Sequence, residues 1–318
     1  MTFAVIVVAA AFIFVGGRND GAPLVALPLQ TLQGTLWVPM ALLWVVMPLV
    51  PLLGFWEVAA SLESLTGFSA DNQLGSIIVL GSVLLTLTVS TAINIPTSIA
   101  LALVGALTGS TLGAGAGVDG PLLTRVLVLG VAAPLVAALL AYLLSHIPLR
   151  GWQKLPPRRL LQVYRGVTFP ILAVAYSING AQKMLFAAAL AAGVGVSSAA
   201  RMPLLLVAMA SVFLLGVFTG LRRSSLFVRH GVASVSPPDL LWTEVATAIA
   251  VAGGSAVGVP LSMTQAITGG LLGTGVAKST RAVNWVSLRR IGIAWLWTLP
   301  FAGLLSYLST IAAAGALR

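Results

Sequence analysis

The chain has 318 residues, of which 58% are apolar and only 8% carry a charge. Because soluble globular proteins carry about 25% charged residues, this composition excludes a water-soluble domain and predicts a polytopic membrane protein. The sequence has no cysteine, which excludes disulfides and thiolate metal sites. The net charge of +10 would suit a nucleic-acid partner by magnitude alone, but its distribution argues against one.

The basic residues gather between apolar runs, in the segments 146–165, 222–238 and 278–290, whereas the acidic segment 56–73 has no lysine or arginine. This lysine and arginine bias is typical of cytoplasmic loops. We therefore predict that the three basic segments lie inside the cell and that 56–73 and both termini lie outside. We expect no nucleic acid to bind.

Apolar runs follow one another along the chain and predict about ten transmembrane helices, since a helix needs about 20 residues to cross a hydrocarbon core of about 30 Å. Polar residues interrupt these runs at "GGRND" (16–20) and at "SINGAQK" (177–183). We interpret the short apolar pieces that follow, 22–33 and 182–198, as half-helices that do not complete a crossing. The expected crossings are 1–17, 35–53, 74–93, 96–115, 124–144, 166–181, 202–221, 240–258, 260–277 and 291–313.

Two landmarks recur in the same order in both halves of the chain. Asn179 follows Asn19 by 160 residues, and "PLSMTQAITGG" (260–270) follows "PTSIALALVGA" (96–106) by 164. Each half holds five expected crossings, an odd number, so the halves have opposite orientation. The prediction is an all-α polytopic membrane protein of two inverted repeats with broken helices, a plan that many secondary transporters share. Its parts are an N-terminal repeat (1–145), a basic cytoplasmic linker (146–165) and a C-terminal repeat (166–318).

Asn19 and Asp20 place hard oxygen ligands directly after the first span. An ionised carboxylate at the bilayer centre costs about 2.5–3.5 kcal/mol, and a bound small cation or a proton would offset that cost. We predict a cation site formed by Asn19, Asp20 and Asn179, and the one metal ion that we expect is sodium at Asp20. The alternative is that Asp20 lies at the water interface beside Arg18 and merely ends the helix.

The two Pro-x-Ser segments predict an anion site. Proline suits the first turn of a helix, where free N–H groups and the positive end of the dipole attract anions. Two such helix starts facing each other would bind a tetrahedral oxyanion through neutral donors. We expect these donors to be Thr97, Ser98, Gln182, Ser262, Thr264 and Gln265. The alternative is that these side chains only join neighbouring helices.

Lys183 lies among apolar residues directly after Gln182. Its side chain either reaches the interface by snorkelling, which we favour, or faces the cavity and attracts the anion.

The motifs resemble those of the inorganic phosphate transporter (Pit) family. Its members carry a duplicated G-A-N-D motif, the second copy followed by A-Q-K, and two P-V-S-T-[ST]-H-A-I-V-G-type segments. Here the first motif reads "GRND" (17–20), the second lies within "SINGAQK", and the two segments are 96–105 and 260–269. The stretch 267–300 is also similar to the family. The resemblance covers nearly the whole chain. It implies a multi-pass carrier in the cell membrane that moves phosphate with sodium ions or protons and needs no cofactor.

The chain departs from the family pattern at several positions. The second Asp of the pattern is Gly180 here, and the His of the two segments is Leu101 and Gln265. A carboxylate and a monovalent cation 4 Å apart attract each other by about 4 kcal/mol at an effective dielectric constant of ~20. Losing one carboxylate is therefore enough to abolish one cation site, and we predict coupling to one cation, or to protons, in place of two sodium ions.

Other functions remain as alternatives at this point. Sulfate, or another tetrahedral oxyanion, is the runner-up substrate. A membrane-embedded enzyme is disfavoured because the sequence has neither H-E-x-x-H nor G-x-S-x-G. A pore or a transport-dead accessory subunit is conceivable because of Gly180. The expected partners are inorganic phosphate and membrane lipid, and a homo-oligomer is compatible with the sequence.

Overall fold

The computed structural model describes residues 1–29, 36–92, 97–147 and 157–316, and these residues are mostly helical. In the first half the elements are α1 (Thr2–Gly16), the π-helical turn η1 (Gly17–Gly21), α2 (Ala22–Leu29), α3 (Trp37–Leu52), α4 (Glu57–Ser64), α5 (Gln73–Ala92), α6 (Ile99–Gly113) and α7 (Gly120–Ser145). In the second half they are α8 (Pro157–Ala192), α9 (Val196–Ala199), α10 (Pro203–Leu226), the π-helical turn η3 (Phe227–Gly231), α11 (Pro237–Ser255), α12 (Met263–Lys278), the short 3₁₀ helix η4 (Thr280–Ala282) and α13 (Trp285–Ala316).

The apolar content of these helices is that of a membrane protein. Among the described residues, five helical segments are long and apolar enough to cross a bilayer, and the longest are Thr2–Leu29, Gly120–Ser145 and Trp285–Ala316. The chain is therefore an all-α, multi-pass membrane protein, as predicted. Polar residues set several of the helix starts. The Asp119 carboxylate accepts a bond from the Leu122 N–H at the start of α7, and Ser236 with Asp239 forms a capping box at the start of α11.

The helices do not break at the two polar motifs. α1, η1 and α2 form one helical run from Thr2 to Leu29, in which "GRNDG" adopts a π-helical turn. α8 is uninterrupted through "SINGAQK". The interpretation of 22–33 and 182–198 as half-helices is therefore wrong, as far as these residues are described. The polar side chains of α8 bond to neighbouring segments inside the protein, so the helix can bury them without unwinding.

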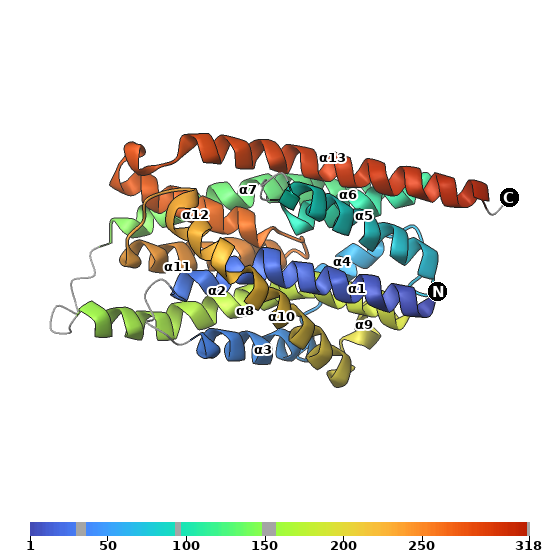
Figure 1. Ribbon diagram of the computed structural model, residues 1–318, viewed down its shortest axis with the longest axis horizontal. Helices are drawn as coiled ribbons and strands as arrows, with labels where there is room; N and C mark the ends of the chain where they lie inside the picture. The colour runs from blue at the N-terminus through green and yellow to red at the C-terminus, as the bar shows by residue number, and fades with distance from the viewer. Residues whose placement is uncertain (30–35, 93–96, 148–156, 317–318) are drawn as a thin grey trace.

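The helices break instead at the two Pro-x-Ser segments. α5 and α6 form one hairpin, and α11 and α12 form another. Figure 1 shows that the two hairpins enter from opposite ends of the molecule and turn back in its middle. α6 and α12 have 15 and 16 residues, or about 24 Å at 1.5 Å per residue, which is short for a hydrocarbon core of about 30 Å. The expected crossings 74–93, 96–115, 240–258 and 260–277 are the four legs of these hairpins.

The remaining long helices run from one end of the molecule to the other. Figure 1 shows α1–α2 and α7 from the first half, and α8, α10 and α13 from the second, and it shows α3 as a shorter helix beside α8 and α10. Both termini lie at the same end as α4, and the connections α10–α11 and α12–α13 lie at the opposite end. There the Ser234 N–H donates to the Ala282 carbonyl at 2.9 Å. The acidic segment thus shares an end with the termini, opposite two of the basic segments, an arrangement that the predicted sidedness requires.

The two halves interlock through glycine. A Cβ at Gly105 or Gly109 of α6 would overlap backbone carbonyls of α13, and a Cβ at Gly269 or Gly273 of α12 would overlap those of α7. Small residues let helix backbones approach closely in membranes. The second leg of each hairpin therefore packs on the last helix of the other half, at matching positions. Within the predicted linker 146–165, residues 148–156 lie outside the described residues, and α8 already begins at Pro157.

Candidate functional site

Asn19 holds the turn of the first hairpin. It lies in η1, where the π-helical turn inserts one extra residue, a feature that often accompanies functional sites. Its side-chain amide donates to the Thr97 carbonyl at 3.2 Å and to Asp20 Oδ1 at 3.0 Å. The predicted motif residue and the predicted Pro-x-Ser segment thus meet directly, near the middle of the long run Thr2–Leu29.

Asn179 holds the turn of the second hairpin in the same way. Its amide donates to Ser255 Oγ at 3.0 Å and to the Val259 carbonyl at 2.9 Å, and its Oδ1 accepts a bond from the Leu261 N–H at 3.0 Å. Each asparagine therefore anchors the hairpin of its own half, which agrees with the repeat read from the sequence. Because Asn179 Oδ1 already accepts one bond, it would coordinate a cation only through its second lone pair.

Asp20 and Lys183 form an ion pair inside the protein. Both side chains are essentially inaccessible to solvent, and Lys183 Nζ lies 3.9 Å from Asp20 Oδ2. Lys183 Nζ also donates to the Leu261 carbonyl in the second hairpin at 2.6 Å. Asp20 Oδ2 accepts no hydrogen bond from the described residues. The interpretation of Lys183 as a snorkelling residue is therefore wrong, and so is the alternative that places Asp20 at the water interface.

Gly180 faces the ring of Tyr176 one turn earlier on α8. A Cβ at Gly180 would overlap this ring, which also packs against Phe213 with ring centroids 5.5 Å apart. The Tyr176 hydroxyl is buried without a hydrogen-bond partner among the described residues, and it lies close enough to Asp20 for the two groups to interact electrostatically. An aromatic ring thus fills the space beside the position at which the family pattern has its second carboxylate.

Ser98 and Ser262 cap the second legs of the two hairpins. Ser98 Oγ accepts a bond from the Leu101 N–H at 3.2 Å, and Ser262 Oγ accepts one from the Gln265 N–H at 3.3 Å. Ser262 Oγ also lies 3.0 Å from Thr264 Oγ1. These serines occupy the N-cap positions of α6 and α12. The first N–H groups of both helices therefore point into the middle of the molecule, as an anion site at a helix start requires.

The other predicted anion-binding residues differ in their surroundings. Thr97 is buried, and its carbonyl accepts a hydrogen bond from the Asn19 amide. Gln265 is buried in the first turn of α12. Gln182 points elsewhere, because its Oε1 accepts a bond from the Ala59 N–H of α4 at 3.0 Å and its amide donates back to the Ile178 carbonyl. Gln182 thus joins α4 to α8 through a hydrogen bond.

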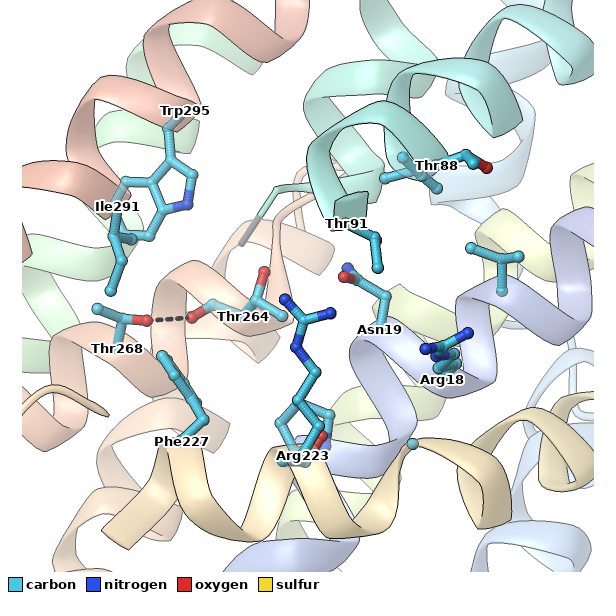
Figure 2. A pocket seen from close by; sticks show the side chains of 15 residues that line it. Arg18, Asn19, Thr88, Thr91, Arg223, Phe227, Thr264, Thr268, Ile291 and Trp295 are labelled. Carbon is cyan, nitrogen blue, oxygen red and sulfur yellow. Dashed lines mark hydrogen bonds between the residues drawn. The ribbon is translucent and has the colours of Figure 1, made fainter. Parts of the chain in front are cut away.

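A cavity of about 600 Å³ reaches the second hairpin from the end of the molecule that carries the basic segments. Figure 2 shows Arg18, Asn19, Arg223, Thr264 and Trp295 around it. The described residues that line it are Val15, Arg18, Asn19, Pro23, Leu87, Thr88, Thr91, Gly220, Arg223, Ser224, Phe227, Thr264, Thr268, Ile291 and Trp295.

Of the predicted site residues, Asn19 and Thr264 are in this lining, and the others are not. Arg18 and Arg223 also line the cavity, although the sequence motifs did not predict them as site residues. Arg18 stands directly before Asn19 in the motif, which was a usable signal, whereas Arg223 looked like one more charge of a cytoplasmic loop.

Comparisons with known proteins agree with these motifs. Residues 153–306 match the model of the phosphate transporter family. A probable low-affinity inorganic phosphate transporter of Mycobacterium tuberculosis is 30% identical over 224 residues, which is 67% of this chain and 53% of that protein. The sodium-dependent phosphate transporter 1-A of Danio rerio is 35% identical over 95 residues, which is 29% of this chain and 15% of that protein. The chain thus spans about half the length of the mycobacterial relative.

A solved structure has the same fold. It is described as the sodium-dependent phosphate transporter, and it superimposes with a TM-score of 0.77 and 17% identity over 98% of each chain. The family and the named relatives are transporters and not enzymes, as predicted for this chain. Together the family model, the named relatives and the fold confirm the recognition of this chain as a relative of the phosphate transporter family.

Proposed function

We propose that the chain is an ion-coupled secondary transporter that moves inorganic phosphate across the cell membrane by alternating access. The observation that carries this proposal is the pair of hairpins that enter from opposite ends and meet Asn19 and Asn179 in the middle of the molecule. Broken helices at corresponding places of inverted repeats are where secondary transporters bind substrate. The names of the relatives, phosphate transporters in both bacteria and fish, support phosphate as the substrate.

The proposed anion site lies between the two capped helix starts. The free N–H groups and hydroxyl hydrogens there are neutral donors, and the dipoles of α6 and α12 favour a negative charge in front of them. Ser98 and Ser262 accept a backbone bond as caps, and the hydroxyls of Ser262 and Thr264 share one hydrogen bond, which leaves one hydrogen of that pair for the anion. We retain Thr97, Ser98, Ser262, Thr264 and Gln265 for this site. Gln182 contributes indirectly, by holding α4 against α8.

The proposed cation site uses Asp20 with Asn19, and Asn179 is a weaker candidate because of its bond to Leu261. Asp20 Oδ2 is the oxygen left open for a sodium ion or a proton. Lys183 supplies one fixed positive charge 3.9 Å away, and the ring of Tyr176 fills the space beside Gly180. These contacts support coupling to one cation, or to protons, in place of two sodium ions.

The position of the cavity supports a state of the protein that is open toward the cytoplasm. Its lining comes from the end of α10 and the start of α13, at the end of the molecule where the basic segments lie. By the positive-inside rule this end faces the cytoplasm. We infer that the structure represents the inward-facing state of the alternating-access cycle.

Sulfate is the second candidate substrate. At neutral pH a phosphate ion still carries a hydrogen that it can donate, and a sulfate ion does not. A site of donors alone would accept either ion, whereas an ionised acceptor such as Asp20 near the anion would favour phosphate. Competition of labelled phosphate uptake by unlabelled sulfate distinguishes them, because strong competition at equal concentrations would indicate a general oxyanion carrier.

Uptake of labelled phosphate into proteoliposomes tests the proposal. We expect uptake that saturates with phosphate concentration and accumulates phosphate only when a sodium or proton gradient is imposed. Uptake that rises linearly with concentration and ignores both gradients would indicate a pore. No uptake under any gradient would indicate an accessory subunit.

A further inference from the structure

The two arginines of the cavity emerge from one wall. A Cβ at Gly220 of α10 would meet the backbone of Arg18, so η1 and α10 are in close contact at this point. Arg223 follows Gly220 by three residues on α10, which places it on nearly the same helix face one turn on. Both side chains line the cavity, and both are exposed. Figure 2 shows Arg223 extending toward Asn19 and Thr264, with Arg18 beside Asn19.

No carboxylate among the described lining residues balances the charge of this wall. None of the described residues that line the cavity is an aspartate or a glutamate. The ion pairs found between described residues join Asp20 to Lys183 and Asp239 to Lys278, and neither includes Arg18 or Arg223. Two guanidinium groups that face one cavity without a carboxylate repel each other. An anion between them would relieve this repulsion.

We propose that Arg18 and Arg223 form a second oxyanion site in the cavity, on the cytoplasmic side of the hairpin turns, which binds hydrogen phosphate after it leaves the turns. The guanidinium group matches this ligand, because its planar fork can donate two parallel hydrogen bonds to phosphate oxygens. Thr264 and Thr268 lie on the α12 wall of the same cavity, so an anion at the arginines is adjacent to the proposed transport site. The choice of phosphate as ligand rests on the proposed function, whereas the site rests on the cavity and its charges.

The motif itself makes Arg18 distinctive. The pattern G-A-N-D has a small residue before its Asn, and "GRND" places an arginine there, which lines the cavity together with Asn19. Arg222 is the matched contrast for Arg223, since it has the same charge, directly precedes it on α10 and is exposed, but does not line the cavity. If anions were only attracted to basic loops in general, they would bind near Arg222 and Arg223 equally. A specific site in the cavity would bind them at Arg223 and not at Arg222.

A chemical footprint on the full wild-type chain tests the site without relying on transport. Phenylglyoxal modifies accessible guanidinium groups, and mass spectrometry with fragmentation resolves Arg222 from Arg223. In nanodiscs, saturating inorganic phosphate should slow the modification of Arg18 and Arg223 and leave that of Arg222 unchanged, relative to chloride at the same ionic strength. Equal protection of Arg222, or no protection of Arg18 and Arg223, would overturn the proposal.

Transport measured separately from each side of the membrane gives a second test. Because the chain has no cysteine, a single Thr280→Cys substitution at the exposed η4 end lets an impermeant thiol reagent report orientation in proteoliposomes. In this background, Arg18→Gln and Arg223→Gln should each raise the half-saturating phosphate concentration on the cytoplasmic side by about tenfold. This corresponds to about 1.4 kcal/mol, near the lower end for a hydrogen bond to a charged group. The external value should change less than about twofold, and Arg222→Gln should change neither.

The outcomes separate this inference from the proposed function. If the wild-type chain transports no phosphate while phosphate still protects both arginines, the transport proposal fails and the site stands. If phosphate transport is normal in both arginine variants and neither arginine is protected, the site is refuted and the transport proposal stands.

Discussion

The ion pair between Asp20 and Lys183 makes a quantitative prediction about stability. The two charges are 3.9 Å apart and buried, and at an effective dielectric constant of ~20 their attraction is worth about 4 kcal/mol. Lys183→Met leaves the Asp20 carboxylate buried with one fewer partner. Removing one member of a buried pair costs about 3–5 kcal/mol, so we expect the free energy of unfolding to fall by that amount. Asp20→Asn should cost a similar amount, because it strands the Lys183 ammonium.

A double-mutant cycle isolates the pair. The variant that combines Asp20→Asn with Lys183→Met removes both charges, so its loss of stability should be smaller than the sum of the two single losses by several kcal/mol. Reversible unfolding in detergent, followed by circular dichroism, measures all four proteins. Lys278→Met is the control, because Lys278 pairs with Asp239 at a partly exposed position, where a salt bridge is worth at most about 1 kcal/mol.

Sodium should act differently on the wild-type chain and on the Lys183→Met variant. Without the ammonium, a sodium ion meets no competing positive charge at the open oxygen of Asp20 and binds there more tightly, and at 100 times its dissociation constant a ligand stabilises the folded state by about 2.7 kcal/mol. We expect sodium chloride to stabilise the variant more than choline chloride at equal concentration, and more than it stabilises the wild-type chain. Additive effects in the cycle, together with no selective effect of sodium, would refute the assignment of Lys183 as the partner of Asp20.

Three further predictions concern the hairpins and α8. Ser262→Ala removes a cap worth about 1 kcal/mol and one hydroxyl donor, so the apparent affinity for phosphate in uptake assays should fall several-fold, and an unchanged affinity would count against the anion site. Gly180→Asp should destabilise the fold by about 1–3 kcal/mol through overpacking against Tyr176; combining it with Tyr176→Ala should recover part of the loss in thermal unfolding, and no recovery would show that the clash lies elsewhere. Gly109→Ala should lower the unfolding temperature because its Cβ would meet the backbone of α13, whereas Gly81→Ala, which has open space around it, should raise it slightly.

The predicted sidedness of the chain does not change when the four hairpin legs are no longer counted as crossings. It depends on where lysine and arginine gather and on whether each half contains an odd number of crossings. Replacing two crossings by one hairpin leaves that parity unchanged. The halves therefore still have opposite orientation when two hairpins replace four crossings. Segment 56–73 likewise still lies at the same end as the termini.

The hairpins themselves could not be predicted, because apolar length reports the absence of water around a segment and not its depth in the bilayer. α5 has 20 residues and reads as a complete span, although it turns back beside Asn19. The reading of polar motifs as breaks failed for a related reason. A buried polar side chain unwinds its helix only when no partner is available, and Asn179, Gln182 and Lys183 all find partners.

The candidate site was partly predictable. The 160-residue spacing of Asn19 and Asn179 indicated their equivalent roles, which the bonds to the two hairpins reproduce. The role of Lys183 depends on the Leu261 carbonyl, 78 residues away in sequence, and no local pattern reveals that contact. Arg223 was counted among the charges of a basic loop because only the packing of α10 on η1 brings it into the cavity.

The proposed coupling, in which phosphate moves together with one cation that binds at Asp20, leads to a kinetic test. Initial rates of labelled phosphate uptake into proteoliposomes, measured against sodium concentration and under imposed proton gradients, test it most directly. We expect a first-power dependence on sodium, or uptake driven by a proton gradient alone, and we expect Asp20→Asn to abolish accumulation although the folded variant can still be purified. A second-power dependence on sodium, or normal accumulation by the Asp20→Asn variant, would contradict it.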